Sequence, residues 1–437
     1  MDGRKGCRKG IAVCLALLMG LSGCGRTEDA GAQMQTLPET LMEGSGVQSA
    51  DEQAASVQAA DGQGESGGSQ MRGSGRLQYA ENVQPLTGEQ ERLLLDYRNL
   101  YFASLEDFEQ EEEIGSFFSN EEQAALADSA IAFQIGLRQM QNADYTLASW
   151  SYVLTLNEVT QEEDGSVHIL ALEDNVQNFS QNPEISSERY GGFHQFELEE
   201  VNGSWKISSH MMFDAVYMML WNEGGWEEAA RRYAQAVPEY LERAREGLLA
   251  REEDRNREPE SVQAQHAYDR QAALVYAEQY VEERNSEWPD YGGRGGNCQN
   301  YASQVLFAGN IPMDAYGDAV WKWYSDEVSN EPGAQGRSSS WTGVDQFVQY
   351  AASNTGYGLA AETDAPYFEG EPGDLLHMGI DGEWDHTVVI ASAVEDEEGN
   401  VVDYLVHSNT GNLRSYPASL YGYPEIILTK ISGWNEG

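Results

Sequence analysis

One cysteine in the sequence stands where a thiol could act as a nucleophile. Cys298 follows a Gly-rich segment at 292–296 and opens an apolar run that ends at Gly309, a pattern that predicts a helix beginning at the cysteine. Backbone N–H groups at a helix N-terminus favour the thiolate and can hold the oxyanion of an acyl transfer. Glycines ahead of the helix would let a substrate backbone come close. Cys298 is therefore the candidate nucleophile.

A thiolate nucleophile needs a base that later returns the proton to the leaving group, and histidine suits that role. His386 opens the apolar, strand-like run HTVVIAS and could face Cys298 from a neighbouring strand. His407 lies in the next strand-like run and Asn409 follows it, so either could orient the base. His377 comes one strand earlier and is interpreted as structural.

The last third of the chain, residues 263–437, carries the elements that would position these groups. An amphipathic helix is predicted at 267–283, ahead of the cysteine helix, and strand patterns follow it. Three side chains are predicted substrate contacts: Asn297 and Gln299 beside the nucleophile, and Trp341 from an aromatic-rich stretch.

This part of the chain resembles the putative amidase domain of secreted Firmicutes proteins, a family related to CHAP and NlpC-type peptidoglycan hydrolases. The resemblance spans the chain from Tyr268 to Trp434 and rests on short motifs in a fixed order. They are Gly296-Asn297-Cys298-Gln299-Asn300-Tyr301-Ala302-Ser303-Gln304, Ser338 with Trp341, Pro372-Gly373-Asp374, His386 to Ile390, and Val406-His407-Ser408-Asn409. The resemblance implies a papain-like cysteine hydrolase fold.

The resemblance also implies roles for individual residues. Cys298 would be the nucleophile, and His386 the general base and then the general acid. His407 matches the third histidine of NlpC-type enzymes, whereas Asn409 would suit a papain-like Cys-His-Asn arrangement. Between the two, His407 is preferred as the third catalytic group.

The N-terminus has the features of an export signal. Basic residues between positions 4 and 9 precede an apolar run at 11–21, which is shorter than the roughly 20 residues that a membrane-spanning helix needs. Residues 1–23 are therefore predicted to be a signal peptide. Leu21-Ser22-Gly23-Cys24 resembles the lipobox of bacterial lipoproteins. This implies lipidation of Cys24 and anchorage to the extracellular face of the cell membrane.

Three regions lie between the signal and the last third. Residues 24–84 are rich in Gly, Ser, Gln and Glu, which predicts a disordered stalk. Residues 85–222 combine helical segments, alternating strand patterns and an Asn202-Gly203 hairpin signal, which favours an α+β cone similar to cystatin-like or SnoaL-like folds. Residues 223–262 are predicted to form a connecting helix with a kink at Pro238.

Charge, cysteine usage and histidine spacing argue against several kinds of partner and site. The formal net charge of −47 would repel phosphate backbones, so nucleic acid is not an expected partner. Of the four cysteines only Cys298 lies in a folded part, so no disulfide framework is expected. His168, His194 and His210 are interpreted as structural, because they lack carboxylate or cysteine partners at ligand spacing in the sequence. No CxxC or HExxH spacing exists, and neither a metal nor a cofactor is expected.

The preferred function is a membrane-anchored extracellular cysteine amidase that hydrolyses an amide bond, in peptidoglycan peptides, through an acyl-enzyme. Asn297 stands where the family pattern has Asp, and Gln299 where it has Thr. These departures flank the nucleophile and leave open a catalytically inactive lipoprotein that binds the wall or a peptide. Acyl transfer to an amine would use the same residues as hydrolysis. Protein partners cannot be inferred from the sequence.

Overall fold

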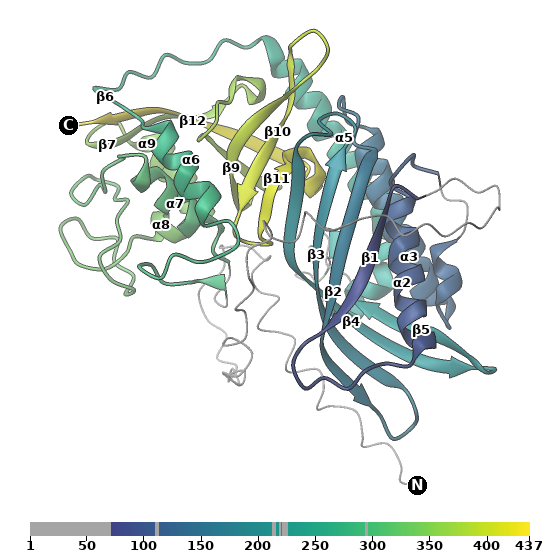
Figure 1. Cartoon of the computed structure of the whole chain (residues 1–437). Helices are drawn as coiled ribbons and strands as arrows, with labels where there is room; N and C mark the ends of the chain where they lie inside the picture. Colours follow the sequence, from purple (N-terminus) through teal and green to yellow (C-terminus); the bar gives the residue numbers. More distant parts are fainter. Residues whose placement is uncertain (1–70, 110–112, 212–215, 218–219, 221–225, 293–295) are drawn as a thin grey trace.

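The two folded parts of the chain share one mixed β-sheet (Figure 1). The computed structural model describes residues 71–109, 113–211, 216–217, 220, 226–292 and 296–437. The predicted signal peptide, Cys24 and most of the predicted stalk lie outside these residues. The sheet has 12 strands in the order β1-β2-β3-β4-β11-β10-β9-β8-β12-β6, with β5 beside β4 and β7 beside β12. The predicted α+β class is confirmed.

The N-terminal unit is built on strands β1 to β5. Their bounds are Gly73–Tyr79 (β1), Leu147–Gln161 (β2), Val167–Phe179 (β3), Ser186–Val201 (β4) and Ser204–Met211 (β5). Strands β2 to β5 are antiparallel neighbours, and buried side chains alternate along β3, as expected for a strand with one face on the core. The predicted hairpin is confirmed, since Asn202 and Gly203 both have positive φ between β4 and β5.

Strand β1 corrects the predicted end of the stalk. It lies inside 24–84, yet it pairs in parallel with β2. A Cβ added at Gly73 would come within 1.9 Å of the Trp150 carbonyl oxygen, and one at Gly75 within 1.9 Å of the Tyr152 ring. The glycines that suggest a linker by composition therefore allow a strand to pack closely against large side chains.

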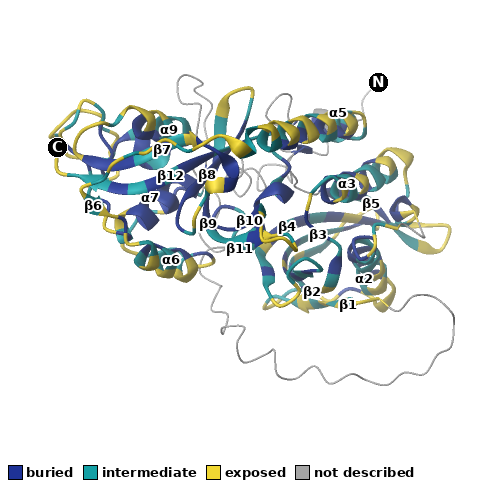
Figure 2. Ribbon diagram, turned by 90° about the horizontal axis from the view of Figure 1, so that it is seen from above, coloured by how far each residue is buried: buried dark blue, intermediate teal, exposed yellow. Residues whose placement is uncertain are grey.

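Three helices belong to this unit: α2 (Gly88–Ala103) and α3 (Glu121–Gln139) pack against its strands, and α5 (Trp226–Glu253) packs on α3 (Figures 1 and 2). The short 3-10 helix η3 lies at Ile114–Phe117. Thr87 and Gln90 form a capping box at the start of α2. Helix α5 contains Pro238 as predicted, but it packs along α3, and Tyr233 and Val237 belong to the core of this unit. The predicted connecting helix is thus part of the N-terminal unit.

Two histidines of this unit form a buried polar chain. His194 Nδ1 lies 2.9 Å from His210 Nε2, and the Tyr97 hydroxyl lies 2.8 Å from His210 Nδ1. His194 Nε2 is 3.7 Å from Glu173 Oε2. Glu173 is therefore a carboxylate neighbour of His194 in space, although the sequence gives no sign of this contact. Pairing between β3 and β4 brings the carboxylate to His194, and spacing along the sequence does not reveal such pairing.

The C-terminal unit places helices against the other half of the sheet. The helices are α6 (Arg270–Gln279), α7 (Cys298–Ala308), α8 (Ser339–Thr342) and α9 (Val344–Ser353). The strands are β6 (His266–Ala267), β7 (Gly358–Ala365), β8 (Leu375–Ile380), β9 (Glu383–Glu395), β10 (Val401–Ser408), β11 (Leu413–Pro417) and β12 (Glu425–Asn435). Short 3-10 helices are η4 (Asp254–Asn256), η6 (Tyr367–Glu369) and η7 (Ala418–Tyr421). The predicted helices and strands around the candidate site are confirmed, with ends shifted by a few residues.

The junction between the two units is made by main chain and by a buried carboxylate. Residues 188–189 of β4 pair with residues 413–414 of β11, which makes the sheet continuous. Asp403, 2% exposed, accepts hydrogen bonds from the hydroxyls of Tyr145 at 2.5 Å and Tyr367 at 3.0 Å. Tyr145 belongs to the N-terminal unit, so these contacts fix how the two units meet.

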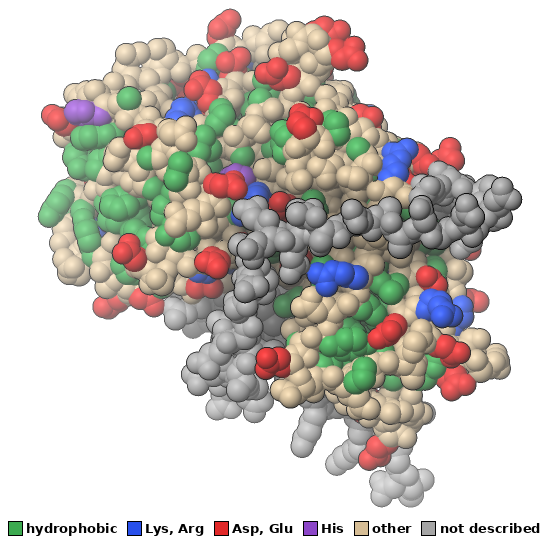
Figure 3. Space-filling view, viewed as in Figure 1, with side chains coloured by type: hydrophobic (Ala, Val, Ile, Leu, Met, Phe, Trp, Pro, Cys, Tyr) green, Lys and Arg blue, Asp and Glu red, His purple; other side chains and the backbone are tan. Residues whose placement is uncertain are grey.

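The surface reflects the acidic composition. Acidic side chains are spread over the face seen in Figure 3, and hydrophobic side chains gather over the C-terminal unit at the left. Exposed large hydrophobic residues of that unit include Val275, Phe307 and Tyr316. None of the helices in the described ranges is long and apolar enough to cross a bilayer.

His377 leads to a testable expectation for acid stability. Its ring is buried on β8, with the hydroxyls of Thr387 and Thr429 at 3.0 and 2.9 Å. Burial lowers the pKa of His377 to about 3, whereas the unfolded chain protonates a histidine below about pH 6.5. The unfolded state therefore binds an extra proton between these values. As the pH is lowered through this window, this one residue should therefore reduce the free energy of unfolding by about 1.4 kcal/mol per pH unit.

Replacing His377 by glutamine should make this slope shallower by that amount, measured by urea denaturation between about pH 6 and pH 4. Thr429→Val is the matched control, because it removes one hydrogen bond but keeps the titrating ring. It should lower the free energy of unfolding and leave the slope unchanged. A slope that stays the same in His377→Gln would show that this ring is not the proton acceptor.

Candidate functional site

Cys298 is the first residue of α7, as the sequence predicts. Asn297 precedes it at the N-cap, and Gly296 has a φ of 111°, which glycine adopts without strain. Cys298 is 2% exposed and lies at the helix end toward which the first backbone N–H groups point. This position favours a thiolate and supplies donors for an oxyanion.

Asn297 fixes the turn that leads into α7. Its side-chain oxygen accepts hydrogen bonds from the backbone N–H of Tyr291 at 3.1 Å and from the Asn300 amide at 2.8 Å. Its own amide donates to Asn409 at 3.2 Å, and its backbone N–H donates to Thr410 Oγ1 at 3.0 Å. The sequence predicts a substrate contact at Asn297, whereas these bonds give it a positioning role.

Gln299 ties α7 to the sheet through a chain of buried polar side chains. The Thr387 hydroxyl donates to Gln299 Oε1 at 2.8 Å, so it accepts from His377 Nδ1, and His377 Nε2 then accepts from Thr429. At its other end, the Gln299 amide donates to Ser303 Oγ at 3.3 Å. Gln299 is fully buried. The predicted substrate contact is therefore corrected: Gln299 holds the nucleophile's helix on the sheet.

Trp341 also differs from the prediction. It is 0% exposed, its ring stacks on Trp321 with centroids 4.7 Å apart, and its Nε1 donates to Asn300 at 3.0 Å. A side chain without exposed surface has no face to offer a substrate. Trp341 is a core residue that supports α7.

His386 lies within β9, 6% exposed, and its orientation is set by Ser408. His386 Nε2 is 3.3 Å from Ser408 Oγ, and the Ser408 hydroxyl donates to the Thr410 carbonyl at 2.9 Å. Because that hydroxyl has one proton, His386 Nε2–H must be the donor in their contact. Nδ1 then carries the lone pair that a base needs. The ring also packs on Tyr421, with centroids 5.3 Å apart.

The two sequence candidates for the third group lie on either side of this serine. His407 Nε2 contacts Glu278 of α6 at 2.9 Å, and Asn409 accepts from Asn297 at 3.2 Å. Within the described residues, neither His407 nor Asn409 forms a hydrogen bond with His386. Ser408, which lies between these two residues in the sequence, makes the contact with His386 instead.

Asp385 and Tyr423 are titratable neighbours that the sequence analysis did not single out. Burial raises the pKa of Asp385, nearby negative groups that include Cys298 add to this, and His386 opposes it. Burial also raises the pKa of Tyr423, with contributions from Asp385 and Cys298. Cys298, Asp385 and His386 therefore share one electrostatic neighbourhood. The adjacency of Asp385 to His386 was a visible signal, whereas Tyr423 gave none.

No metal centre is formed by the part of the chain that the structure describes: it has no group of three or more His, Cys, Asp and Glu side chains that could hold an ion. His407 and Glu278 form a pair, at 2.9 Å.

Comparison with known proteins finds a match to one family model over this site. Residues 267–431 match the family model described as a putative amidase domain, which indicates amide hydrolysis as the reaction class. The chain is similar to the uncharacterized protein YhbB of Bacillus subtilis (strain 168), with 32% identity over 149 residues, or 34% of this chain and 43% of that protein. The chain therefore matches less than half of the length of this curated relative. No solved structure matches the chain.

Proposed function

We propose that the chain is a cysteine amidase, anchored to the extracellular face of the cell membrane, that hydrolyses an amide bond in peptidoglycan peptides. One observation carries the proposal: Cys298 begins α7 within the residues that match an amidase domain. The anchorage rests on the lipobox-like sequence that ends at Cys24. The choice of peptidoglycan rests on this anchorage and on the reach of the predicted stalk.

The proposed reaction uses Cys298 and His386 in two stages. In the first, the Cys298 sulfur attacks the amide carbon while its proton passes to His386 Nδ1, and backbone N–H groups at the start of α7 stabilise the oxyanion. The C–N bond then breaks, the amine leaves with the proton from His386, and a thioester remains. In the second, water gives a proton to His386 and its oxygen attacks the thioester, which releases the carboxylic acid and the thiol. Ser408 is the positioning residue for His386.

The test is amine release from purified peptidoglycan peptides by the chain without residues 1–24, combined with acid quenching and mass spectrometry of the protein. The proposal predicts turnover and an added mass on Cys298 equal to the acyl part of the substrate. Turnover without a modified Cys298 would contradict the thioester. Binding of these peptides without any turnover would favour a catalytically inactive wall-binding lipoprotein.

A further inference from the structure

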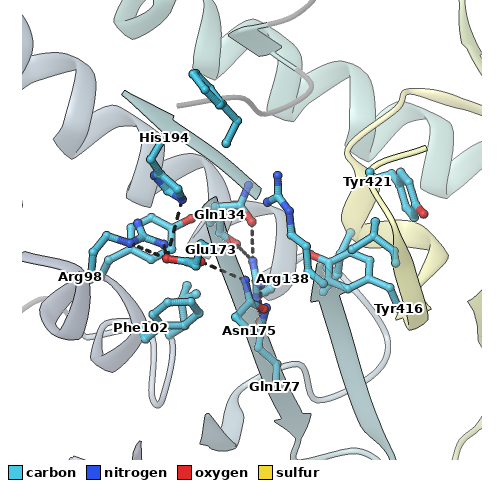
Figure 4. A pocket seen from close by; sticks show the side chains of 18 of the residues that line it. Arg98, Phe102, Gln134, Arg138, Glu173, Asn175, Gln177, His194, Tyr416 and Tyr421 are labelled. Carbon is cyan, nitrogen blue, oxygen red and sulfur yellow. Dashed lines mark hydrogen bonds and ion pairs between the residues drawn. The ribbon is translucent and has the colours of Figure 1, made fainter. Parts of the chain in front are cut away.

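A cavity of about 180 Å³ lies between the two units, beside the candidate site (Figure 4). One wall comes from α2, α3, β3 and β4 of the N-terminal unit, and the other from β9, β11, η7 and the loop after β10. Pockets for drug-sized ligands have volumes of roughly 300–1,000 Å³. This cavity is smaller and suits a group of the size of one amino-acid residue.

The lining carries an excess of positive charge. Its arginines are Arg98, Arg138 and Arg189, and its one acidic side chain among the described lining residues is Glu173. Arg98 pairs with Glu173 at 2.8 Å, as Figure 4 shows. Burial, and then the charges of Arg98 and Arg189, hold the pKa of His194 well below its usual value, so His194 stays neutral. Among the described lining residues, Arg138 and Arg189 therefore have no acidic partner.

Arg138 makes only neutral contacts. It is 3% exposed, and it donates to the Gln134 side chain at 2.7 Å and to Gln177 at 3.4 Å. Its buried Nε has no hydrogen-bond partner among the described residues. Arg189, which is half-buried, makes no side-chain hydrogen bond or ion pair with any residue in the described ranges. A buried cation without an anion is costly, and this chain has a net charge of −47. An anionic ligand would complete the site.

The opposite wall of the cavity adjoins the candidate nucleophile. His386, Thr410 and Tyr423 line it. Thr410 Oγ1 accepts the backbone N–H of Asn297, the residue before Cys298, at 3.0 Å. A group held by the arginines therefore lies beside His386, and the molecule that carries this group can continue toward the start of α7.

We propose that this cavity binds a free carboxylate of the substrate, so that the amide is cut in a peptide whose carboxylate lies about one residue from the scissile bond. Guanidinium groups match carboxylates in geometry and charge. Apolar walls that include Phe102 and Tyr416 would contact the carbon atoms of that residue. The identity of the substrate rests on the proposed function, whereas carboxylate binding requires no reaction at Cys298.

Binding is tested first in the Cys298→Ser variant by calorimetric titration with N-acetylalanine, and with N-acetylalaninamide as the uncharged match. We expect N-acetylalanine to bind and N-acetylalaninamide not to bind. Arg189→Gln should weaken binding of N-acetylalanine at least about tenfold, and Arg189→Lys, which keeps the charge, should weaken it less. Arg76→Gln, at an exposed position on β1, is the matched control and should leave binding unchanged. Equal affinity for the two probes, or no effect of Arg189→Gln, would overturn the proposal.

Turnover distinguishes a substrate carboxylate from a separate small acid that binds at the same place. Two peptides that differ only in a terminal carboxylate or carboxamide are compared by kcat/KM. The proposal predicts a preference for the carboxylate peptide, which Arg189→Gln reduces toward equality. Carboxylate binding without any preference in turnover would contradict the assignment to substrate. Carboxylate binding by a protein that cleaves neither peptide nor any peptidoglycan peptide would instead overturn the proposed function and leave the anion site standing.

Discussion

Replacing Cys298 by alanine is expected to reduce kcat/KM for amine release by at least about 10³-fold, because only binding and oxyanion stabilisation would remain. The measurement is turnover of the peptidoglycan peptide that the wild-type chain cleaves best. Cys298→Ser is the matched variant. It keeps the shape of the side chain but replaces the thiol by a hydroxyl, which is far less acidic than a thiol and therefore a much weaker nucleophile in this site.

Both variants should unfold within about 1 kcal/mol of the wild type, since each changes one small side chain at the start of a helix. The unfolding measurement separates loss of chemistry from loss of structure. An alanine variant that still cleaves at a rate close to that of the wild type would show that Cys298 is not the nucleophile.

Replacing Glu173 by alanine is expected to lower the free energy of unfolding by about 3–5 kcal/mol. Glu173 is 3% exposed, and its Oε2 lies 2.9 and 2.8 Å from two nitrogens of Arg98. Burial, the largest single effect, disfavours the charged form of Arg98, but attraction to Glu173 together with that to nearby tyrosines outweighs it and raises the pKa of Arg98. A guanidinium is so basic that it stays charged even when its carboxylate partner is removed, so the cost of the substitution is that of an unpaired buried cation.

Urea denaturation measures this cost, with Glu197→Ala on the exposed side of β4 as the control. That variant should change the free energy of unfolding by less than about 0.5 kcal/mol. If Glu173→Ala lowers the free energy of unfolding by less than about 1 kcal/mol, the ion pair between Arg98 and Glu173 is not shielded from water, which would contradict this expectation. If Glu173→Ala remains folded, it should bind N-acetylalanine more tightly than the wild type, because the cavity then has one negative charge fewer.

The features that the sequence predicts correctly are encoded by near neighbours along the chain. The helix that starts at Cys298 follows from a Gly-rich turn and an apolar run, and the β4–β5 hairpin follows from Asn202 and Gly203. Each signal is complete within about a dozen residues. Periodicity also locates the strands that carry His386 and His407, with ends that shift by a few residues.

The features that the sequence does not reveal depend on pairing between distant segments. The sequence predicts a stalk where strand β1 lies, because glycines are typical of linkers. The reason for these glycines is their close approach to Trp150 and Tyr152, which are distant in the sequence. The sequence predicts that Gln299 contacts the substrate, because it lies beside the nucleophile. Its hydrogen bond with Thr387 joins a helix to a distant strand, and the sequence does not reveal it. Likewise, the positive cavity forms only where β4 meets β11, which brings Arg189 to the wall that faces His386.

The central claim, that Cys298 and His386 act as nucleophile and base, is tested most directly by the pH dependence of iodoacetamide alkylation, comparing the wild type with His386→Ala. Without residues 1–24, Cys298 is the one remaining thiol. Burial slows alkylation at every pH, so the midpoint is measured rather than the rate. We expect a midpoint well below the value of about 8.5 for an ordinary cysteine, and a shift toward that value in His386→Ala. A midpoint near 8.5 that does not respond to His386→Ala would contradict the claim.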